Sequence, residues 1–432
     1  MKMANMDDYF DVVIVGTGAA GLYCALNLPA RYRILLLTKQ KADESDSFLA
    51  QGGICMQHGE ADYRPFFDDT MRAGHYENNP ATVDLMIRSS NSIIRDLVRR
   101  DVRFARNDHG ALRFTREGAH SRPRILFHED ITGHEITQTL LNEVLRCENI
   151  ELREHTTLLD FFADASACGG VIAAGPDGEP RAIGAGAVVL ACGGIGGLYK
   201  NSTNFPHITG DAIAMALRHG VACEHLDYIQ IHPTTLYSHR KGRRFLISES
   251  VRGEGALLLD KNGNRFTNEL QPRDVVSAAI RAQMEKDGTD HVWEDMRPIG
   301  EAAIREHFPN ILERCEEEGY DPIHEPIPVV PAQHYFMGGI TADLSSRTAL
   351  PRLYACGETC CNGVHGRNRL ASNSLLESLV FAQRAADDIL YGEPPVFTGD
   401  KPDLAPYREQ EPLFAAYQQE VLTAIERSKN HE

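Results

Sequence analysis

The chain has 432 residues, of which 42% are hydrophobic and 36 are glycine, and its formal net charge at pH 7 is −17. This length predicts two or three units rather than one simple domain, and the composition suits an α/β protein. The negative charge disfavours nucleic acid and anionic membranes as partners, whereas a local cluster of arginines would still bind an anionic substrate.

The N-terminus and the cysteines indicate where such a protein works. The stretch from Met1 to Asp8 is polar and acidic, which predicts no secretory signal peptide. No apolar run in the sequence approaches the roughly 20 residues that span a bilayer. The ten cysteines lack paired CxxC spacing, so we expect reduced thiols in a cytoplasmic protein. Cys356, Cys360 and Cys361 lie close together without partners at ligand spacing, so we predict no metal site.

The first element is a short apolar run, Val12 to Val15, followed by a glycine turn and by apolar residues at helical spacing. The turn matches GxGxxG, with Gly16, Gly18, Ala19, Ala20 and Gly21. In this strand–turn–helix context the pattern is a dinucleotide fingerprint. The first glycine permits the turn, the second lets the backbone approach a pyrophosphate, and the third lets helix and strand pack closely. We therefore predict a bound dinucleotide, with its phosphates at the helix N-terminus.

The second predicted strand, residues 33–38, ends at Lys39. The usual NAD fingerprint has an acidic residue there to bind the ribose hydroxyls. Lys39 therefore argues against NAD and leaves NADP or a flavin dinucleotide.

The next segment, residues 45–54, joins small polar residues to a pair of glycines. A backbone of this kind can press against a flat ligand and donate N–H groups to it. Its sequence SFLAQGGI contains Ser47, Ala50, Gln51, Gly52 and Gly53, and it resembles the flavin loop of the fumarate reductase/succinate dehydrogenase flavoprotein family. The resemblance implies FAD as cofactor. Respiratory members of that family carry a flavin-linking histidine five residues before the glutamine, where this chain has Asp46, so the FAD is expected to be non-covalent.

Further along, residues 79–103 have apolar residues at spacings of three or four, which predicts a helix, and Thr132 opens another. A hairpin is predicted for residues 150–187. A buried strand, residues 187–190, then ends at a glycine pair. Asp211, which begins the next predicted helix, is either a helix cap or a flavin contact.

The family resemblance covers the chain from Asp11 to about Leu390 and implies an α/β fold: a Rossmann-like FAD-binding domain with an inserted α+β capping domain. We expect the FAD-binding domain in residues 1–222 and 341–392, and the capping domain in residues 223–340. Residues 393–432 would form a shortened C-terminal helical tail, with one helix at about 413–427. Relatives usually continue into a full helical domain here, so the tail departs from the family pattern.

Oxidation of a small dicarboxylate requires cations for two carboxylates, a group that exchanges a proton, and a flavin that accepts hydride. Five residues in segments rich in glycine, proline or other small residues are candidates: His232, Arg252, Arg273, His334 and Arg369. The resemblance implies carboxylate binding by His232, Thr235, His334 and Arg369, proton exchange by Arg273, and substrate orientation by Arg252. It also implies flavin contacts from Glu358, Ser374 and Leu375.

Glu117, in the segment REGAHS, decides between possible substrates. A succinate site has no reason to hold a carboxylate beside a dianion, whereas an aspartate site needs a counter-ion for the α-ammonium group. The segment resembles the version of this loop in family members that oxidise aspartate. We therefore predict oxidation of L-aspartate to iminoaspartate, with Glu117, Arg273 and His232 as catalytic residues. The resemblance also implies flavin reoxidation by O2 or fumarate, and transfer of the product to quinolinate synthase in NAD biosynthesis.

Two alternatives remain open at this point. The first is a soluble fumarate reductase or succinate dehydrogenase flavoprotein, which would not need Glu117. The second is a non-catalytic flavin-binding module, which predicts loss of the arginines and histidines that the chain in fact retains. Whether oxidation begins at the C–N or the C–C bond is also left open.

Overall fold

The computed structural model describes residues 8–239, 242–392 and 397–429, so the acidic stretch at residues 1–7 lies outside the described part. Its largest feature is a seven-stranded sheet of strand order β6-β2-β1-β9-β8-β7, with β16 also paired to β9. The strands are β1 Tyr9–Val15, β2 Ile34–Leu37, β6 Ile150–Arg153, β7 Thr157–Ala163, β8 Cys168–Ala174, β9 Pro180–Leu190 and β16 Leu353–Ala355.

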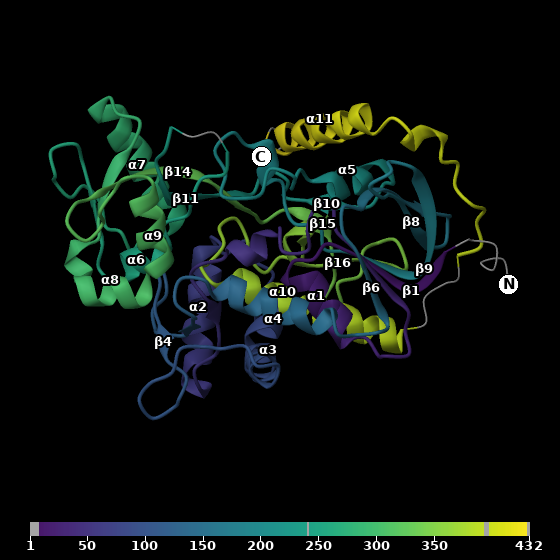
Figure 1. The fold of residues 1–432 in the computed structure, drawn as a ribbon, viewed down its shortest axis with the longest axis horizontal. Helices are drawn as coiled ribbons and strands as arrows, with labels where there is room; N and C mark the ends of the chain where they lie inside the picture. The colour runs from purple at the N-terminus through teal and green to yellow at the C-terminus, as the bar shows by residue number, and fades with distance from the viewer. Residues whose placement is uncertain (1–7, 240–241, 393–396, 430–432) are drawn as a thin grey trace.

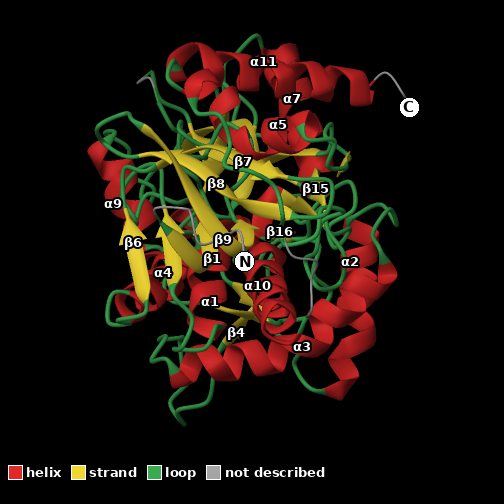
Figure 2. Ribbon diagram, turned by 90° about the vertical axis from the view of Figure 1, so that its right-hand side faces the viewer, coloured by secondary structure: helices red, strands yellow, loops and turns green. Residues whose placement is uncertain are grey.

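The central strands β1, β2 and β9 pair in parallel and are apolar on both faces, as expected of a strand covered by helices on each side. Val12 and Ile14 of β1 belong to the core on one face of the sheet, and Val13 and Val15 to the core on the other. Figure 2 shows the sheet between these two helical layers. The helices of the first face are α1 Ala19–Asn27, α3 Pro80–Arg99, α4 Thr132–Val144 and α10 Asn373–Tyr391, and those of the second are α5 Asp211–Arg218 and α11 Gln410–Lys429.

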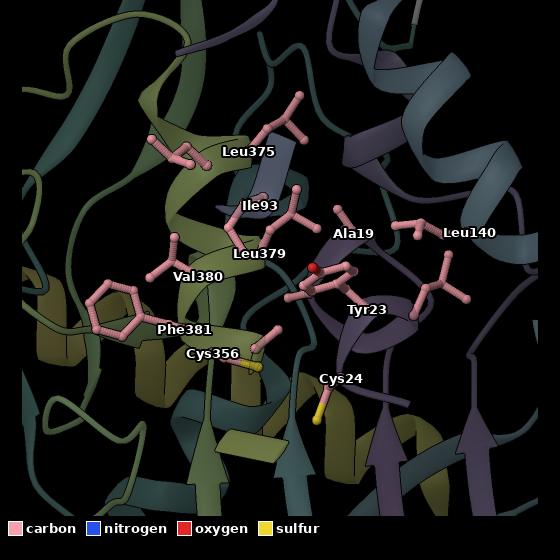
Figure 3. Close-up of a cluster of buried hydrophobic side chains, with 14 of the residues drawn as sticks. Ala19, Tyr23, Cys24, Ile93, Leu140, Cys356, Leu375, Leu379, Val380 and Phe381 are labelled. Atoms are coloured by element: carbon pink, nitrogen blue, oxygen red, sulfur yellow. The ribbon is translucent and has the colours of Figure 1, made fainter. Parts of the chain in front are cut away.

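The core of the first face forms where α1 and α10 cross (Figure 3). Tyr23 of α1 lies between Leu379 of α10 and Leu140 of α4, and its hydroxyl donates to Asp96 at 2.9 Å. This packing fixes α1, and with it the glycine turn, against the end of the sheet.

A second unit, inserted between β10 and β15, has its own sheet of order β11-β14-β13-β12 and its own apolar core (Figure 1, green). It comprises β11 Ile229–Leu236, α6 Glu249–Gly253, β12 Leu257–Leu259, α7 Arg273–Asp287, β13 Val292–Asp295, α8 Glu301–His307, α9 Pro309–Glu317 and β14 Ile327–Phe336. We call residues 229–336 the second unit and the rest the main unit.

Smaller elements connect the two units. One three-stranded sheet at their junction contains β10 Cys223–Glu224, β15 Gly339–Thr341 and β17 Cys360–Cys361. Another contains β3 Ile54–Cys55, β4 Phe114–Thr115 and β5 Ile125–Leu126, next to α2 Tyr63–Ala73. No helix among the described residues is both long and apolar enough to cross a membrane.

Several predicted elements differ in extent from those observed. The helix predicted for residues 79–103 is α3, capped by Asn79, whose side chain accepts from the Ala81 amide, and it ends at Arg99. The predicted hairpin is wrong in detail, because β6 pairs in parallel with β2 while β7, β8 and β9 form an antiparallel meander. The last helix, α11, is longer than predicted and packs on α5 along the upper side of the main unit in Figure 1.

Candidate active site

A large pocket runs from the glycine turn of the main unit to side chains of the second unit. Its empty space, including the opening to solvent, is about 1690 Å³. Eighteen of the predicted site residues line it: Gly16, Gly18, Ala20, Lys39, Ser47, Ala50, Gln51, Gly52, Gly53, Glu117, Asp211, His232, Arg273, His334, Glu358, Arg369, Ser374 and Leu375. Four others, Ala19, Gly21, Thr235 and Arg252, are not part of the lining.

The glycine turn has the geometry that a dinucleotide requires. Gly16 has φ +111°, and a Cβ there would lie 2.0 Å from the carbonyl oxygen of Ala191, the residue after β9. A Cβ at Gly21 would lie 1.9 Å from the carbonyl oxygen of Gly16, so this residue also has to be glycine. Gly18 caps α1 without a side-chain hydrogen bond, which leaves helix N–H groups for a pyrophosphate.

The loop after β2 faces this turn. Ser47 accepts a hydrogen bond from the Ala19 amide at 3.0 Å. Within the described structure, the buried side-chain oxygens Ser45 Oγ and Gln51 Oε1 lack hydrogen-bond partners. Buried polar atoms are normally paired, so these two oxygens fit a missing polar ligand. The residues present therefore fit FAD.

Lys39 and Asp211 form an ion pair on the pocket wall. The Lys39 ammonium donates to Asp211 Oδ2 at 2.7 Å and to the His207 carbonyl at 3.3 Å. The cap of α5 is Gly210, and Asp211 is its first residue, accepting from Thr209 as well. Asp211 is thus not the N-cap residue. Because its carboxylate already neutralises Lys39, the lysine offers little net charge to the 2′-phosphate of NADP.

Asp46 occupies the position where respiratory relatives have the flavin-linking histidine. One of its carboxylate oxygens accepts from the Phe205 amide at 2.9 Å. Burial raises its pKa to about 7. A carboxylic acid does not form the histidyl–flavin bond.

The opposite part of the pocket is rich in cations and imidazoles. Arg273 donates from Nε to Glu249 at 2.5 Å and from Nη1 to Gln230 at 2.9 Å. Arg369 donates to Ser374 at 3.0 Å, and its Nε has no partner among the described residues. Burial, together with the nearby Arg273 charge, lowers the pKa of Arg369 to about 10. These two guanidinium groups have only one carboxylate partner, Glu249, and the excess positive charge favours an anionic ligand.

The two histidines complete this wall, with ring centroids 5.0 Å apart. His334 Nδ1 lies 2.7 Å from the hydroxyl of Thr203, which fixes the ring. His232 Nδ1 lies 2.9 Å from the Thr234 carbonyl oxygen and 3.2 Å from the Thr234 amide nitrogen, so it donates to the first in one tautomer and accepts from the second in the other. His232 Nε2 is buried and has no partner in the described chain. Burial and the Arg273 charge hold the pKa of both histidines well below the ordinary value, so both are neutral without a ligand.

Glu117 is buried at the junction of the two units, with only 3% of its surface exposed. Its carboxyl oxygens accept from Ser250 of the second unit at 2.9 Å and from Ser372 of the main unit at 2.5 Å. Burial, and then the charge of Glu249, raises its pKa. A Cβ at Gly52 would lie 2.2 Å from Glu117 Oε1, so the glycine loop and this carboxyl are in direct contact.

Two predicted substrate residues lie behind the pocket wall. The Thr235 hydroxyl donates to the Val330 carbonyl at 2.6 Å within the sheet, so its proton is directed at the backbone and not into the pocket. Arg252 donates to the Glu269 carbonyl at 2.7 Å and lies 3.8 Å from Glu249. Arg252 therefore acts on the pocket through Glu249.

Sequence reasoning missed residues that support the site. Burial opposes ionisation of Glu249, but the charges of Arg273 and Arg252 outweigh it and lower its pKa. Arg124 is fully buried and binds Asp62 and Asp69, while Asp69 also accepts from Ser121 in the loop that carries Glu117. Glu249 precedes the RGEG segment in the sequence, so sequence reasoning could have identified it. The Arg124 contacts join distant parts of the chain, so no local pattern indicated them.

The cysteines Cys356, Cys360 and Cys361 are buried free thiols. Within residues 8–239, 242–392 and 397–429, no group of His, Cys, Asp or Glu is arranged to hold a metal ion.

Comparison with known proteins agrees with this geometry. A family model described as FAD binding domain matches residues 11–375. The L-aspartate oxidase of Clostridium perfringens is 47% identical over 380 residues, which cover 88% of this chain and 86% of that protein. The L-aspartate oxidase of a Nostoc species is 44% identical over 401 residues, covering 90% of this chain and 69% of that protein.

Solved structures give the same relationship at greater distance. A variant of the E. coli quinol fumarate reductase subunit FrdA superposes with a TM-score of 0.82 at 30% identity, covering 95% of this chain and 74% of that one. Mycobacterium smegmatis Sdh1 superposes with a TM-score of 0.75 at 31% identity, covering 90% of this chain and 70% of that one. The chain therefore belongs to the L-aspartate oxidase family of FAD-binding flavoproteins.

Proposed function

We propose that this protein is an FAD-dependent enzyme that oxidises L-aspartate to iminoaspartate. The observation that carries the proposal is the buried carboxyl of Glu117 in a pocket whose other ionised groups include Arg273 and Arg369. Such a pocket suits a ligand that has two carboxylates and one ammonium group. FAD, when bound, supplies the acceptor for one hydride, which carries the two electrons of the oxidation.

The cations bind and orient the two carboxylates. The unpartnered Nε of Arg369 and the guanidinium of Arg273 provide planar donors, and His334 offers a ring nitrogen on the same wall. A dianionic ligand next to His232 favours its protonated form, which turns Nε2 into a donor. Each of these groups is buried or partly buried, so water does not screen the interactions.

Glu117 is proposed to hold the α-ammonium group. Its two serine partners fix the carboxyl in place without neutralising it. Proton removal is assigned to Glu117 or to Arg273, whose Nε is hydrogen-bonded to the ionised Glu249. A guanidinium is a poor proton donor, so in this assignment the Glu249 carboxylate at its Nε is the group that accepts the proton from Arg273.

The rest of the proposal concerns the architecture and the partners. Residues 1–222 and 341–392 would form a domain that binds FAD without a covalent bond, residues 223–340 a capping domain, and residues 393–432 a short helical tail. Reduced flavin would be reoxidised by O2 or by fumarate; fumarate is supported by the likeness to fumarate reductases. Iminoaspartate would pass to quinolinate synthase in NAD biosynthesis.

The test is anaerobic bleaching of the bound flavin in purified protein, with L-aspartate in one cuvette and succinate in another. Bleaching by L-aspartate alone supports the proposal. The alternative, a fumarate reductase or succinate dehydrogenase flavoprotein, has the lower sequence identity and predicts bleaching by succinate alone.

A further inference from the structure

The C-terminal helix α11 lies against the part of the pocket that Lys39 and residues 207–212 form. Figure 1 shows α11 along the outer side of α5, whose first residue is Asp211. Val421 of α11 packs on the cap of α5, since a Cβ at Gly210 would lie 3.5 Å from Val421 Cγ1. Tyr417 is fully buried, and its hydroxyl donates to the Leu159 carbonyl at 2.7 Å. The helix is thus firmly attached beside a pocket wall.

One side chain of α11 reaches the pocket cation directly. The Lys39 ammonium lies 4.8 Å from the centroid of the Phe414 ring. The same ammonium donates to Asp211 Oδ2 and to the His207 carbonyl. Lys39, Asp211 and His207 line the pocket, whereas Phe414 is not part of the lining. Phe414 therefore contacts the Lys39 ammonium from outside the pocket.

These contacts matter because a lysine side chain is long and flexible. An ammonium has three N–H donors, of which Asp211 and His207 use two. Contact with an aromatic face attracts the ammonium further. Ordering Lys39 before the cofactor arrives reduces the entropy lost on binding.

We propose that Phe414 is a positioning residue for the adenosine half of the FAD cofactor, acting through Lys39. Lys39 follows β2, and in dinucleotide-binding folds the residue at this position contacts the adenosine ribose. The C-terminal helix thereby contributes to cofactor affinity, although none of its described residues lines the pocket. The inference rests on FAD as the cofactor and not on which substrate is oxidised.

The experiment measures cofactor affinity in the full chain without substrate, so it is independent of the aspartate assay. Flavin-free protein is titrated with FAD, with ADP as the adenosine half, and with FMN as the flavin half. Phe414→Leu removes the ring but keeps an apolar side chain, Phe414→Tyr keeps a ring, and Leu422→Ala is a control. Leu422 lies on the same helix and is 39% exposed.

We expect Phe414→Leu to weaken FAD and ADP binding by about two- to fivefold, the size of one cation–π contact. FMN binding stays unchanged, Phe414→Tyr restores both affinities, and Leu422→Ala behaves as wild type. In a Lys39→Met background, the Phe414→Leu effect disappears, because the two side chains act as one unit. Wild-type ADP affinity in Phe414→Leu, equal weakening of FMN and ADP, or a persisting effect without Lys39 would each overturn the inference.

Discussion

Replacing Glu117 with glutamine tests the residue on which substrate choice depends. The change removes the charge and keeps the size of a side chain that is 3% exposed. One serine partner, Ser250 or Ser372, continues to donate to the amide oxygen, and the other hydroxyl turns to accept from the amide nitrogen. The pocket should therefore stay intact, and the loss of activity should report the loss of charge.

The expected magnitude follows from burial. A hydrogen bond to a charged group contributes about 1.5–3 kcal/mol, and no water screens the pair in this pocket. Glu117→Gln should therefore lower kcat/KM for L-aspartate by about 10- to 150-fold. Anaerobic stopped-flow measurement of flavin bleaching gives this ratio. Ser250→Ala is the matched control, because it removes one hydrogen bond and leaves the carboxyl, and it should cost far less.

The pH dependence provides a second reading of the same residue. Burial, and then Glu249, raises the pKa of Glu117, so the carboxyl ionises at a higher pH than an exposed glutamate. Only the ionised form binds an ammonium group as a counter-ion, so kcat/KM for L-aspartate should rise with pH through this pKa. The acidic limb should vanish in Glu117→Gln. Full activity of that variant on L-aspartate, or an unchanged pH profile, would refute the reasoning.

Three further predictions concern binding and stability. Arg369→Lys should raise KM for L-aspartate at least tenfold in steady-state assays, because a lysine cannot form the planar pair of hydrogen bonds to a carboxylate; an unchanged KM would exclude this arginine from the carboxylate site. Gly16→Ala should abolish FAD retention on gel filtration, since its Cβ would lie 2.0 Å from the Ala191 carbonyl oxygen. Arg124→Met should lower the free energy of unfolding in urea by about 3–5 kcal/mol, because it leaves buried Asp62 without its arginine partner and removes one of the two arginines that bind Asp69. Burial alone would raise the pKa of Asp69, but the hydrogen bonds to its carboxylate outweigh this effect and lower the pKa. The stabilisation that Asp69 provides is therefore complete above the unfolded pKa of about 3.9 and is lost as the pH falls through the folded pKa. Acid unfolding at the same pH in Arg124→Met and wild type would contradict this account.

Local patterns in the sequence predicted the elements that form the cofactor half of the pocket. The apolar run Val12 to Val15 and the glycine turn have fixed spacing, and the structure forms β1, the turn and α1 there, although β1 begins at Tyr9. The predictions of the hairpin and of the helix ends were less accurate. β6 could not be assigned to the main sheet from sequence because its partner β2 lies more than a hundred residues earlier.

The substrate half depends on contacts that no local pattern contains. Glu117 was identified through a family resemblance, but its partners Ser250 and Ser372 come from separate parts of the chain. Thr235 was assigned to the carboxylate-binding group through the family resemblance, and in the structure its hydroxyl donates to the Val330 carbonyl. Adjacent residues in a strand point to opposite faces, and a bulge near His232 shifts that alternation, so the direction of the Thr235 side chain could not be read from the sequence.

The position of Glu117 also links substrate recognition to the arrangement of the two units. Its carboxyl accepts one hydrogen bond from Ser250 of the second unit and one from Ser372 of the main unit. Displacing the second unit would break the first bond and remove Arg273 from the pocket at the same time, because both groups belong to that unit. A carboxyl that has lost a buried partner pays an added cost unless a ligand donor replaces it. The α-ammonium of aspartate is such a donor, whereas succinate has none.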